Sequence, residues 1–174
     1  MTTELDDFRA DKDAFFKTHP QSPLTPAQQR GFKGLSYFDE NPALRFELEV
    51  TPFAERDTVE IQTSTGDVRA YQRYGFVNFS VDGAAVRLTL FATPHGFFLP
   101  FVDSLAGKET YPAGRYLDPE PLGGNRFQVD FNLAYNPYCA YNDNYSCPLT
   151  PFENRLKVPI RAGERLFLDA VHGD

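Results

Sequence analysis

The side chains best able to bind a ligand or take part in a reaction are concentrated in one stretch of the chain, residues 132–154. Asparagines and tyrosines crowd this stretch, and Pro137, Pro148 and Pro151 fix the backbone between them. Turn-forming residues at this density predict a long ordered loop. Amide and phenol groups recognise sugars, nucleobases and other polar ligands by hydrogen bonding. We therefore predict a binding site for a small polar ligand under this loop, with contacts from Asn132, Tyr135, Asn136 and Tyr138.

A structural explanation of the same loop stays open. In that alternative, the amides bond to the loop's own backbone and the tyrosine rings cover the open end of a sheet. Upstream, Lys108 and Arg115 would add contacts if the ligand is an anion. The alternative for this upstream block is a solvated loop whose surface ion pairs contribute about 0–1 kcal/mol each.

Two cysteines, Cys139 and Cys147, lie eight positions apart in the loop. As structural thiols they would be inert, and as a disulfide they would contribute about 2–3 kcal/mol by the chain-entropy argument. As a nucleophile, Cys139 would need a neighbouring base. The spacing C-x7-C is not a zinc spacing and no second cysteine pair accompanies it, so no metal and no cofactor is predicted. The three histidines, which lie in a linker, a turn and near the C-terminus, do little to supply a base: His19, His95 and His172.

Two further functions compete with ligand binding. The first is a small-molecule enzyme, hydrolase-like, that uses Cys139 or the carboxylates Asp103, Glu109 and Asp130 as acid and base. The second is a structural protein or a homodimer whose exposed aromatic loop forms the interface.

The amino-acid composition argues against two classes of partner, nucleic acids and membranes. The 174 residues carry 24 acidic and 17 basic side chains, a formal charge of −7, which disfavours nucleic acid as a partner. No apolar run approaches the roughly 20 residues that cross a bilayer, so no membrane partner is predicted. The first residues show no basic and apolar leader. An acidic, soluble, cytoplasmic protein with reduced thiols is the expectation.

The elements that must position these residues are mostly strands. Apolar residues at helical spacing predict a helix near the start, and Thr25-Pro26 predicts the start of a second one, over about residues 26–30. From about residue 43 the apolar period changes to two, and Asp82-Gly83 predicts a hairpin turn. We predict a mainly β fold, an antiparallel β-barrel or sandwich of about eight or nine strands, in one domain over residues 1–174, with residues 1–33 as a helical segment packed on it. The last strands are predicted near residues 113–118, 126–133 and 164–171.

Several long motifs resemble one family of uncharacterised bacterial and archaeal proteins, domain-of-unknown-function family 1684. The resemblance covers nearly the whole chain, departs at Leu105-Ala106, where the family more usually shows Thr-Ser, and implies no established activity. It rests on Asp130-Phe131-Asn132, Ala134-Tyr135-Asn136-Pro137, Cys139-Ala140-Tyr141, Cys147-Pro148 and Ile160-Arg161-Ala162-Gly163-Glu164.

Overall fold

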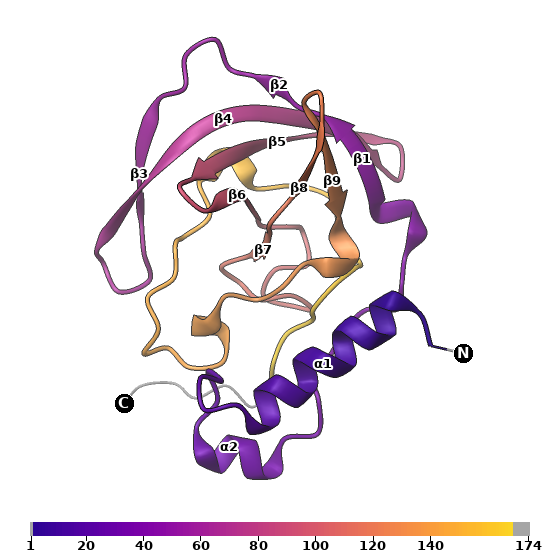
Figure 1. The fold of residues 1–174 in the computed structure, drawn as a ribbon, viewed down its shortest axis with the longest axis vertical. Helices are drawn as coiled ribbons and strands as arrows, with labels where there is room; N and C mark the ends of the chain where they lie inside the picture. Colours follow the sequence, from indigo (N-terminus) through magenta and orange to yellow (C-terminus); the bar gives the residue numbers. More distant parts are fainter. Residues whose placement is uncertain (1, 169–174) are drawn as a thin grey trace.

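The computed structural model describes residues 2–168, and its chain begins with two capped helices. Helix α1 covers Glu4–Thr18, and Thr3 caps it because its hydroxyl accepts from the Asp6 N–H while Asp6 accepts from the Thr3 N–H. Helix α2, Pro26–Gly31, starts with the same reciprocal cap from Thr25 and Gln28. Both helices predicted from the sequence are therefore confirmed. Figure 1 shows them together at one end of the molecule.

Nine strands of the described chain form two antiparallel sheets (Figure 1). One sheet has the order β1-β9-β8, and the other has the order β2-β4-β5-β6-β7 with β3 also paired to β4. The sheets do not close into a barrel over these residues, so the sandwich form of the predicted mainly β fold is the one that occurs. The strands are β1 (Arg45–Glu49), β2 (Thr51–Pro52), β3 (Thr58–Gln62), β4 (Val68–Val81), β5 (Ala84–Thr93), β6 (Gly96–Phe101), β7 (Arg115–Leu117), β8 (Glu120–Gly123) and β9 (Arg126–Asp130).

The longest hairpin joins β4 and β5 through the predicted turn. Asp82 and Gly83 have φ angles of 50° and 84°, the left-handed values that a two-residue turn of this hand requires. The register of β4 shifts between Arg73 and Gly75, and a Cβ at Gly75 would stand 2.5 Å from the Thr51 carbonyl oxygen. The glycine thus permits the close approach of β2.

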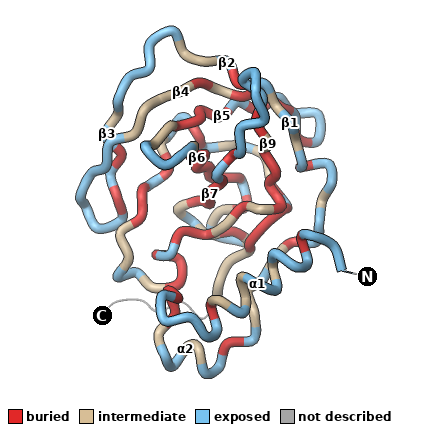
Figure 2. Tube along the Cα trace, in the orientation of Figure 1, coloured by how far each residue is buried: buried red, intermediate tan, exposed pale blue. Residues whose placement is uncertain are grey.

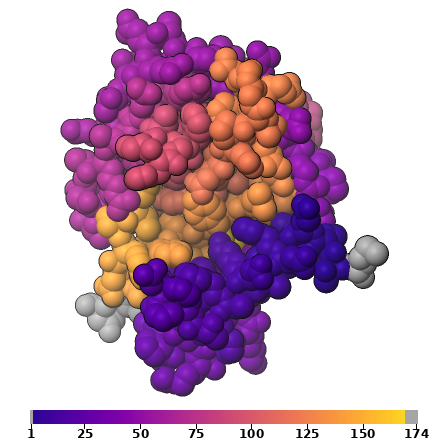
Figure 3. All heavy atoms as spheres, viewed as in Figure 1, coloured from indigo at the N-terminus to yellow at the C-terminus, as the bar shows by residue number. Residues whose placement is uncertain are grey.

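The core lies between the sheets, and a smaller cluster lies beneath the helices. Figure 2 shows the buried segments in the centre of the sandwich, with exposed residues on the outer turns and helices. In the smaller cluster, Phe16 packs edge-on against Tyr141 with the ring centroids 4.9 Å apart. Figure 3 shows the helical segment lying against the residues of the long loop. The N-terminal segment therefore covers the end of the sandwich from which the candidate site is built.

Two predicted strands at the end of the chain need correction. The strand predicted over residues 126–133 stops at Asp130, because the Asp130 carboxylate accepts from the Asn132 N–H and starts the 3₁₀ turn η2 (Phe131–Leu133). The strand predicted over 164–171 is wrong within the described part. There, Glu164 makes only an isolated bridge to Tyr37, and residues 169–174 lie outside the described chain. The carbonyls of Ile160, Ala162 and Glu164 accept from Arg115.

Strand β8 was not predicted from the sequence, because Pro121 and Gly123 are typical of a loop. It is an edge strand, where proline is tolerated since one side of the strand needs no partner. The extent of a single domain over residues 1–174 stays a prediction. Neither helix of residues 2–168 combines the length and the apolar character that a membrane crossing needs.

Candidate functional site

The loop predicted to carry the site consists of short 3₁₀ turns separated by proline. After η2 come η3 (Tyr138–Ala140) and η4 (Phe152–Asn154), each preceded by a proline; a similar turn, η1 (Pro42–Leu44), precedes β1. Asn154 is completely buried, and its side chain bonds to the backbone of Thr89 and Pro100. The end of the loop is thereby fixed to strands β5 and β6.

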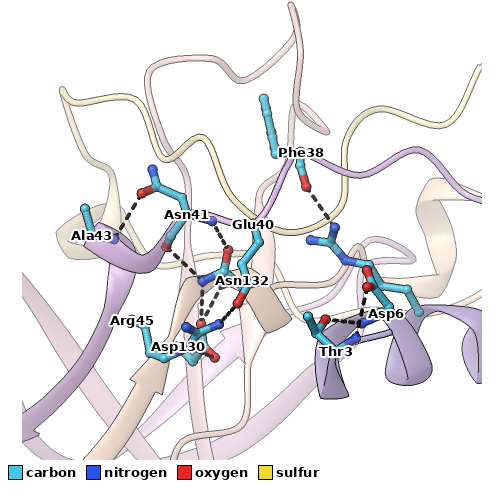
Figure 4. A network of polar contacts seen from close by, with 10 residues as sticks. Thr3, Asp6, Phe38, Glu40, Asn41, Ala43, Arg45, Asp130 and Asn132 are labelled. Carbon is cyan, nitrogen blue, oxygen red and sulfur yellow. Dashed lines mark hydrogen bonds and ion pairs between the residues drawn. The ribbon is translucent and has the colours of Figure 1, made fainter. Parts of the chain in front are cut away.

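Asn132 joins the start of the loop to the segment before β1 (Figure 4). Its amide nitrogen donates to the Asn41 carbonyl at 3.0 Å and to Asp130 at 2.9 Å. Its amide oxygen accepts from the Asn41 N–H at 2.8 Å. Both polar ends are therefore used inside the protein, as in the structural explanation of the loop.

Asn136 is held from the C-terminal segment. Its side-chain nitrogen donates to the Arg165 carbonyl at 3.0 Å, and its backbone N–H donates to the Glu164 carboxylate at 3.2 Å. Its side-chain oxygen is buried and has no hydrogen-bond partner among residues 2–168. Tyr138 lies elsewhere, against the rings of Phe16 and Tyr145.

Glu164 is a buried carboxylate that the sequence reasoning missed as a polar centre. It is 2% exposed, accepts from the Tyr141 hydroxyl and pairs with the Lys12 ammonium at 2.5 Å. Burial beside this carboxylate raises the pKa of Tyr141 well above its ordinary value. The only signal in the sequence was its place in the motif Ile160-Arg161-Ala162-Gly163-Glu164.

Arg115, predicted to contact an anionic ligand, lies inside the protein. It is 1% exposed, its guanidinium donates to three carbonyls of residues 160–164, and it faces Asp103 at 3.7 Å. Burial lowers its pKa to about 10, against the opposite effect of Asp103 and Glu164. Asp103 also accepts from the Thr110 hydroxyl and the Ile160 N–H, each at 2.8 Å. This pair fastens the C-terminal segment to β7.

The other upstream candidates do not converge with these residues. Glu109 pairs at the surface with Arg161 at 2.7 Å and Arg165 at 3.5 Å, and Lys108 beside it is exposed. Asp130 pairs with Arg45 at 3.1 Å. The three carboxylates of the enzyme hypothesis are thus each engaged by different arginines, and Lys108 does not share a site with the buried Arg115.

Tyr135 is the loop residue that reaches an open cavity. Its hydroxyl donates to the two carboxylate oxygens of Asp118, at 3.0 and 2.8 Å, and Lys12 lies 5.2 Å from its ring centroid. Asp118 follows β7, where the chain crosses from one sheet to the other, and keeps an exposed surface. The surrounding walls raise the pKa of Asp118 by desolvation, although the Tyr135 hydroxyl and Lys12 act in the opposite direction.

Two cavities share the segment that begins at Asp118. The larger, of about 780 Å³, falls within the range of small-molecule sites and is bounded by the β5–β6 turn and the start of β8. The smaller, of about 200 Å³, extends toward Tyr135 and α1. Figures 1 and 3 show β6 and β8 side by side on the same face of the molecule. We call these two cavities the crossover cleft; its shared wall is Asp118, Pro119 and Glu120.

The crossover cleft combines aromatic rings with negative charge. Tyr71 and Phe98 stack with centroids 5.4 Å apart and line the larger cavity. Asp118 and Glu120 supply exposed carboxylates, Asp130 supplies a buried one that Arg45 already pairs, and neither cavity has Lys or Arg among its described lining residues. The sequence did not predict Asp118 and Glu120 as site residues, because the cleft forms only where the β5–β6 turn meets the segment that connects β7 to β8.

The two cysteines are free and buried in the loop, away from the crossover cleft's lining. The Cys139 N–H donates to the Cys147 sulfur at 3.3 Å, and the Tyr111 hydroxyl lies 3.6 Å from the Cys139 sulfur. His19 stacks on Phe15, and His95 lines the larger cavity. His172 lies outside the described residues.

The fold and the site together define a β-sandwich with a helical cover and an acidic, aromatic cleft at the crossover between its sheets. The sequence model of the family described as "Protein of unknown function (DUF1684)" matches residues 30–165, and the chain belongs to this family. The resemblance predicted from the sequence motifs is thereby confirmed.

A solved structure extends the comparison. The uncharacterized protein from gene locus rrnAC0354 of Haloarcula marismortui, determined by solution NMR, is 38% identical, with a TM-score of 0.72 over 95% of this chain and 94% of that one. No functionally curated protein matches.

Proposed function

We propose that this protein binds a small polar ligand carrying a positively charged group, and that the crossover cleft is its site. The observation that carries the proposal is Asp118, an exposed carboxylate at the wall shared by two cavities and oriented by the Tyr135 hydroxyl. The site keeps the predicted contact from Tyr135 and shifts the remaining contacts from the loop to the crossover.

The charge of the lining favours a cation over an anion. The carboxylates of Asp118 and Glu120 attract an ammonium group, and a face of Tyr71 or Phe97 is suited to hold its alkyl or methyl substituents by cation–π contact. His95 and Thr93 add polar groups at the rim. A phosphate or carboxylate ligand would meet the like charge of these side chains.

Titration with organic cations tests the proposal. The ¹H–¹⁵N spectrum of the protein is recorded with putrescine, choline and spermidine, with glucose and phosphate as neutral and anionic probes. We expect saturable shifts confined to residues 93–98 and 118–121 for at least one cation. Shifts only for phosphate, or none for any cation up to millimolar concentration, would contradict the proposal.

Asp118→Asn supplies the matched test of the carboxylate. Since a hydrogen bond to a charged group contributes about 1.5–3 kcal/mol and about 1.4 kcal/mol is a factor of ten, affinity is expected to fall at least about tenfold. Glu55→Gln, an exposed carboxylate in the β2–β3 loop, is the control and leaves affinity unchanged. Equal affinity in the wild type and Asp118→Asn would exclude Asp118 as the binding carboxylate.

One observation supports self-association as a second candidate function. Phe152 in η4 is 86% exposed, and with Leu149 it borders a cavity of about 480 Å³ that is also lined by residues of β3. Such an exposed aromatic side chain is typical of an interface. Light scattering at micromolar concentration is expected to give a dimer mass that Phe152→Ser reduces to the monomer; a monomeric wild type would reject this candidate.

A further inference from the structure

We infer that Cys139 and Cys147 form a peroxide-oxidisable dithiol, in which Cys139 is the attacking sulfur and Cys147 the resolving sulfur. The inference is independent of the crossover cleft, because neither cysteine lines either of its cavities. It assigns the loop a site of reversible covalent modification.

The first support is the placement of the two sulfurs. Cys139 follows Tyr138 in η3, and its own N–H donates to the Cys147 sulfur at 3.3 Å. The side chains of the two cysteines also hydrogen-bond to each other, so the two sulfurs are neighbours. Both residues are buried, with 8% and 7% of their surface exposed, so the oxidant that reaches them must be as small as hydrogen peroxide.

The second support is that the surroundings separate the two thiols chemically. The Cys147 thiol and the Tyr111 hydroxyl hydrogen-bond to the Cys139 sulfur, and the pKa of Cys139 falls to about 6 against the effect of burial. The pKa of Cys147 is raised, because it donates to Cys139 and is itself buried. These contacts favour the thiolate, the reactive form, at Cys139 and the protonated thiol at Cys147.

The third support is the anchoring of Cys147 to the β3–β4 turn. Its N–H donates to the Ser64 hydroxyl at 3.1 Å, and its carbonyl accepts from the Ser64 N–H at 2.9 Å. Asp67 in the same turn accepts from three hydroxyls, including that of Ser146, which lowers its pKa to about 2. This turn fixes the resolving sulfur while Cys139 stays on a separate, short turn.

The reaction balances with one peroxide. The Cys139 thiolate attacks a peroxide oxygen, so that an S–O bond forms, the O–O bond breaks and the departing oxygen leaves as water after taking up a proton. The Cys147 sulfur then attacks the Cys139 sulfur, forming the S–S bond and breaking the S–O bond. The hydroxide released takes the Cys147 proton and leaves as a second water. Two electrons pass from the thiols to the peroxide, and a dithiol reductant reverses the change.

Intact-mass analysis of the reduced, folded protein after hydrogen peroxide treatment tests the inference. We expect a loss of two hydrogen atoms and a non-reduced peptide that links Cys139 to Cys147. Cys147→Ser is expected to accumulate a sulfenic acid at Cys139 that dimedone traps, and Cys139→Ser to leave Cys147 unmodified. Two intact thiols in the treated wild type, or a disulfide that appears only after denaturation, would overturn the inference. The wild-type result requires no variant to fold.

The pH dependence of the oxidation rate tests whether the surroundings of Cys139 activate its thiol or whether the thiol reacts like any free cysteine. The rate for the wild type is expected to rise with pH through a midpoint near 6, and Tyr111→Phe is expected to move that midpoint upward, since the hydroxyl stabilises the thiolate. Tyr138→Phe, which removes the hydroxyl of the residue next to Cys139 in the chain, is the control and leaves the midpoint in place. A wild-type midpoint at the ordinary thiol value of about 8.5 would contradict the assignment of Cys139 as the attacking sulfur.

Discussion

The interior around Arg115 and the cleft around Asp118 are two polar regions built on opposite principles. In the interior, the Arg115 guanidinium is 1% exposed and both of its terminal nitrogens have protein partners, whereas its Nε is buried and has none among residues 2–168. In the cleft, Asp118 has one protein donor, the Tyr135 hydroxyl, and an exposed carboxylate. Both regions hold charged residues close to β7, yet only the second presents an exposed charge to a ligand.

The difference teaches how to separate structural from ligand-binding polar residues in a β-sandwich. A buried charge that donates to carbonyls far along the chain stabilises the fold by linking the two segments, because its loss leaves those carbonyls without donors. An exposed charge at a cavity wall contributes little to stability and is free to bind. Mutations in the two regions should therefore affect different properties.

The largest effect is expected from Arg115→Ala. Removing a buried guanidinium that pairs with Asp103 is expected to lower the free energy of unfolding by about 3–5 kcal/mol, because the carboxylate stays buried without its counter-ion. Urea unfolding measures the change. Arg126→Ala, at a 52% exposed side chain, is the control, expected within about 0.5 kcal/mol of the wild type. A loss below about 1 kcal/mol for Arg115→Ala would show that Arg115 does not stabilise the fold by linking the C-terminal segment to β7.

A smaller effect is expected from Glu164→Gln. The amide retains a hydrogen bond to Tyr141 but removes the charge opposite Lys12, so the expected loss is about 1.5–3 kcal/mol. The control is Glu40→Gln, which breaks the exposed pair with Arg45 and is expected to cost about 0–1 kcal/mol. Equal losses in the two variants would remove the distinction between buried and exposed pairs.

The smallest effect on stability is expected from Asp118→Asn, within about 0.5 kcal/mol of the wild type. The pKa of Asp118 determines how its contribution to stability changes with pH. Because folding raises the pKa of Asp118 above 3.8, this group favours the folded state at low pH, and that contribution is lost as pH rises past 3.8 through the folded value. Asparagine does not ionise, so the variant should lose this decline when unfolding is measured across that pH window. A variant that unfolds readily at pH 7 would place Asp118 with the interior residues.

Much of the fold follows from local patterns. The capping threonines, the alternation of Leu44, Phe46 and Leu48 and the left-handed turn at Asp82-Gly83 each encode their element within a few residues. The strand predicted over residues 164–171 failed because alternation does not reveal long-range contacts. The N–H groups of Arg165 and Leu166 donate to the carbonyls of Ser36 and Glu109, and the Glu164 carbonyl accepts from Arg115.

The candidate site was less predictable, for the same physical reason. Asparagine density located the loop but not the direction of the side chains, and Asn132 turns out to bond to Asn41, 91 positions away. Asp118 and His95 attracted no binding prediction because nothing in their local sequence says that a turn and a crossover form one cavity. Sequence patterns therefore reveal elements and dense polar segments, whereas cavities depend on tertiary contacts.

The contact between Lys12 and Glu164 spans 152 positions and has a consequence for synthesis of the chain. While the ribosome is still translating, α1 has its own cap and the contacts of Phe16 with Leu24 and Phe32 to support it, and an isolated helix of 15 residues is marginal in water. Its buried partners, Tyr141 and Glu164, emerge near the end of translation. The end of the sandwich that α1 covers therefore stays open until residues 141–164 have been made, so α1 docks on it late.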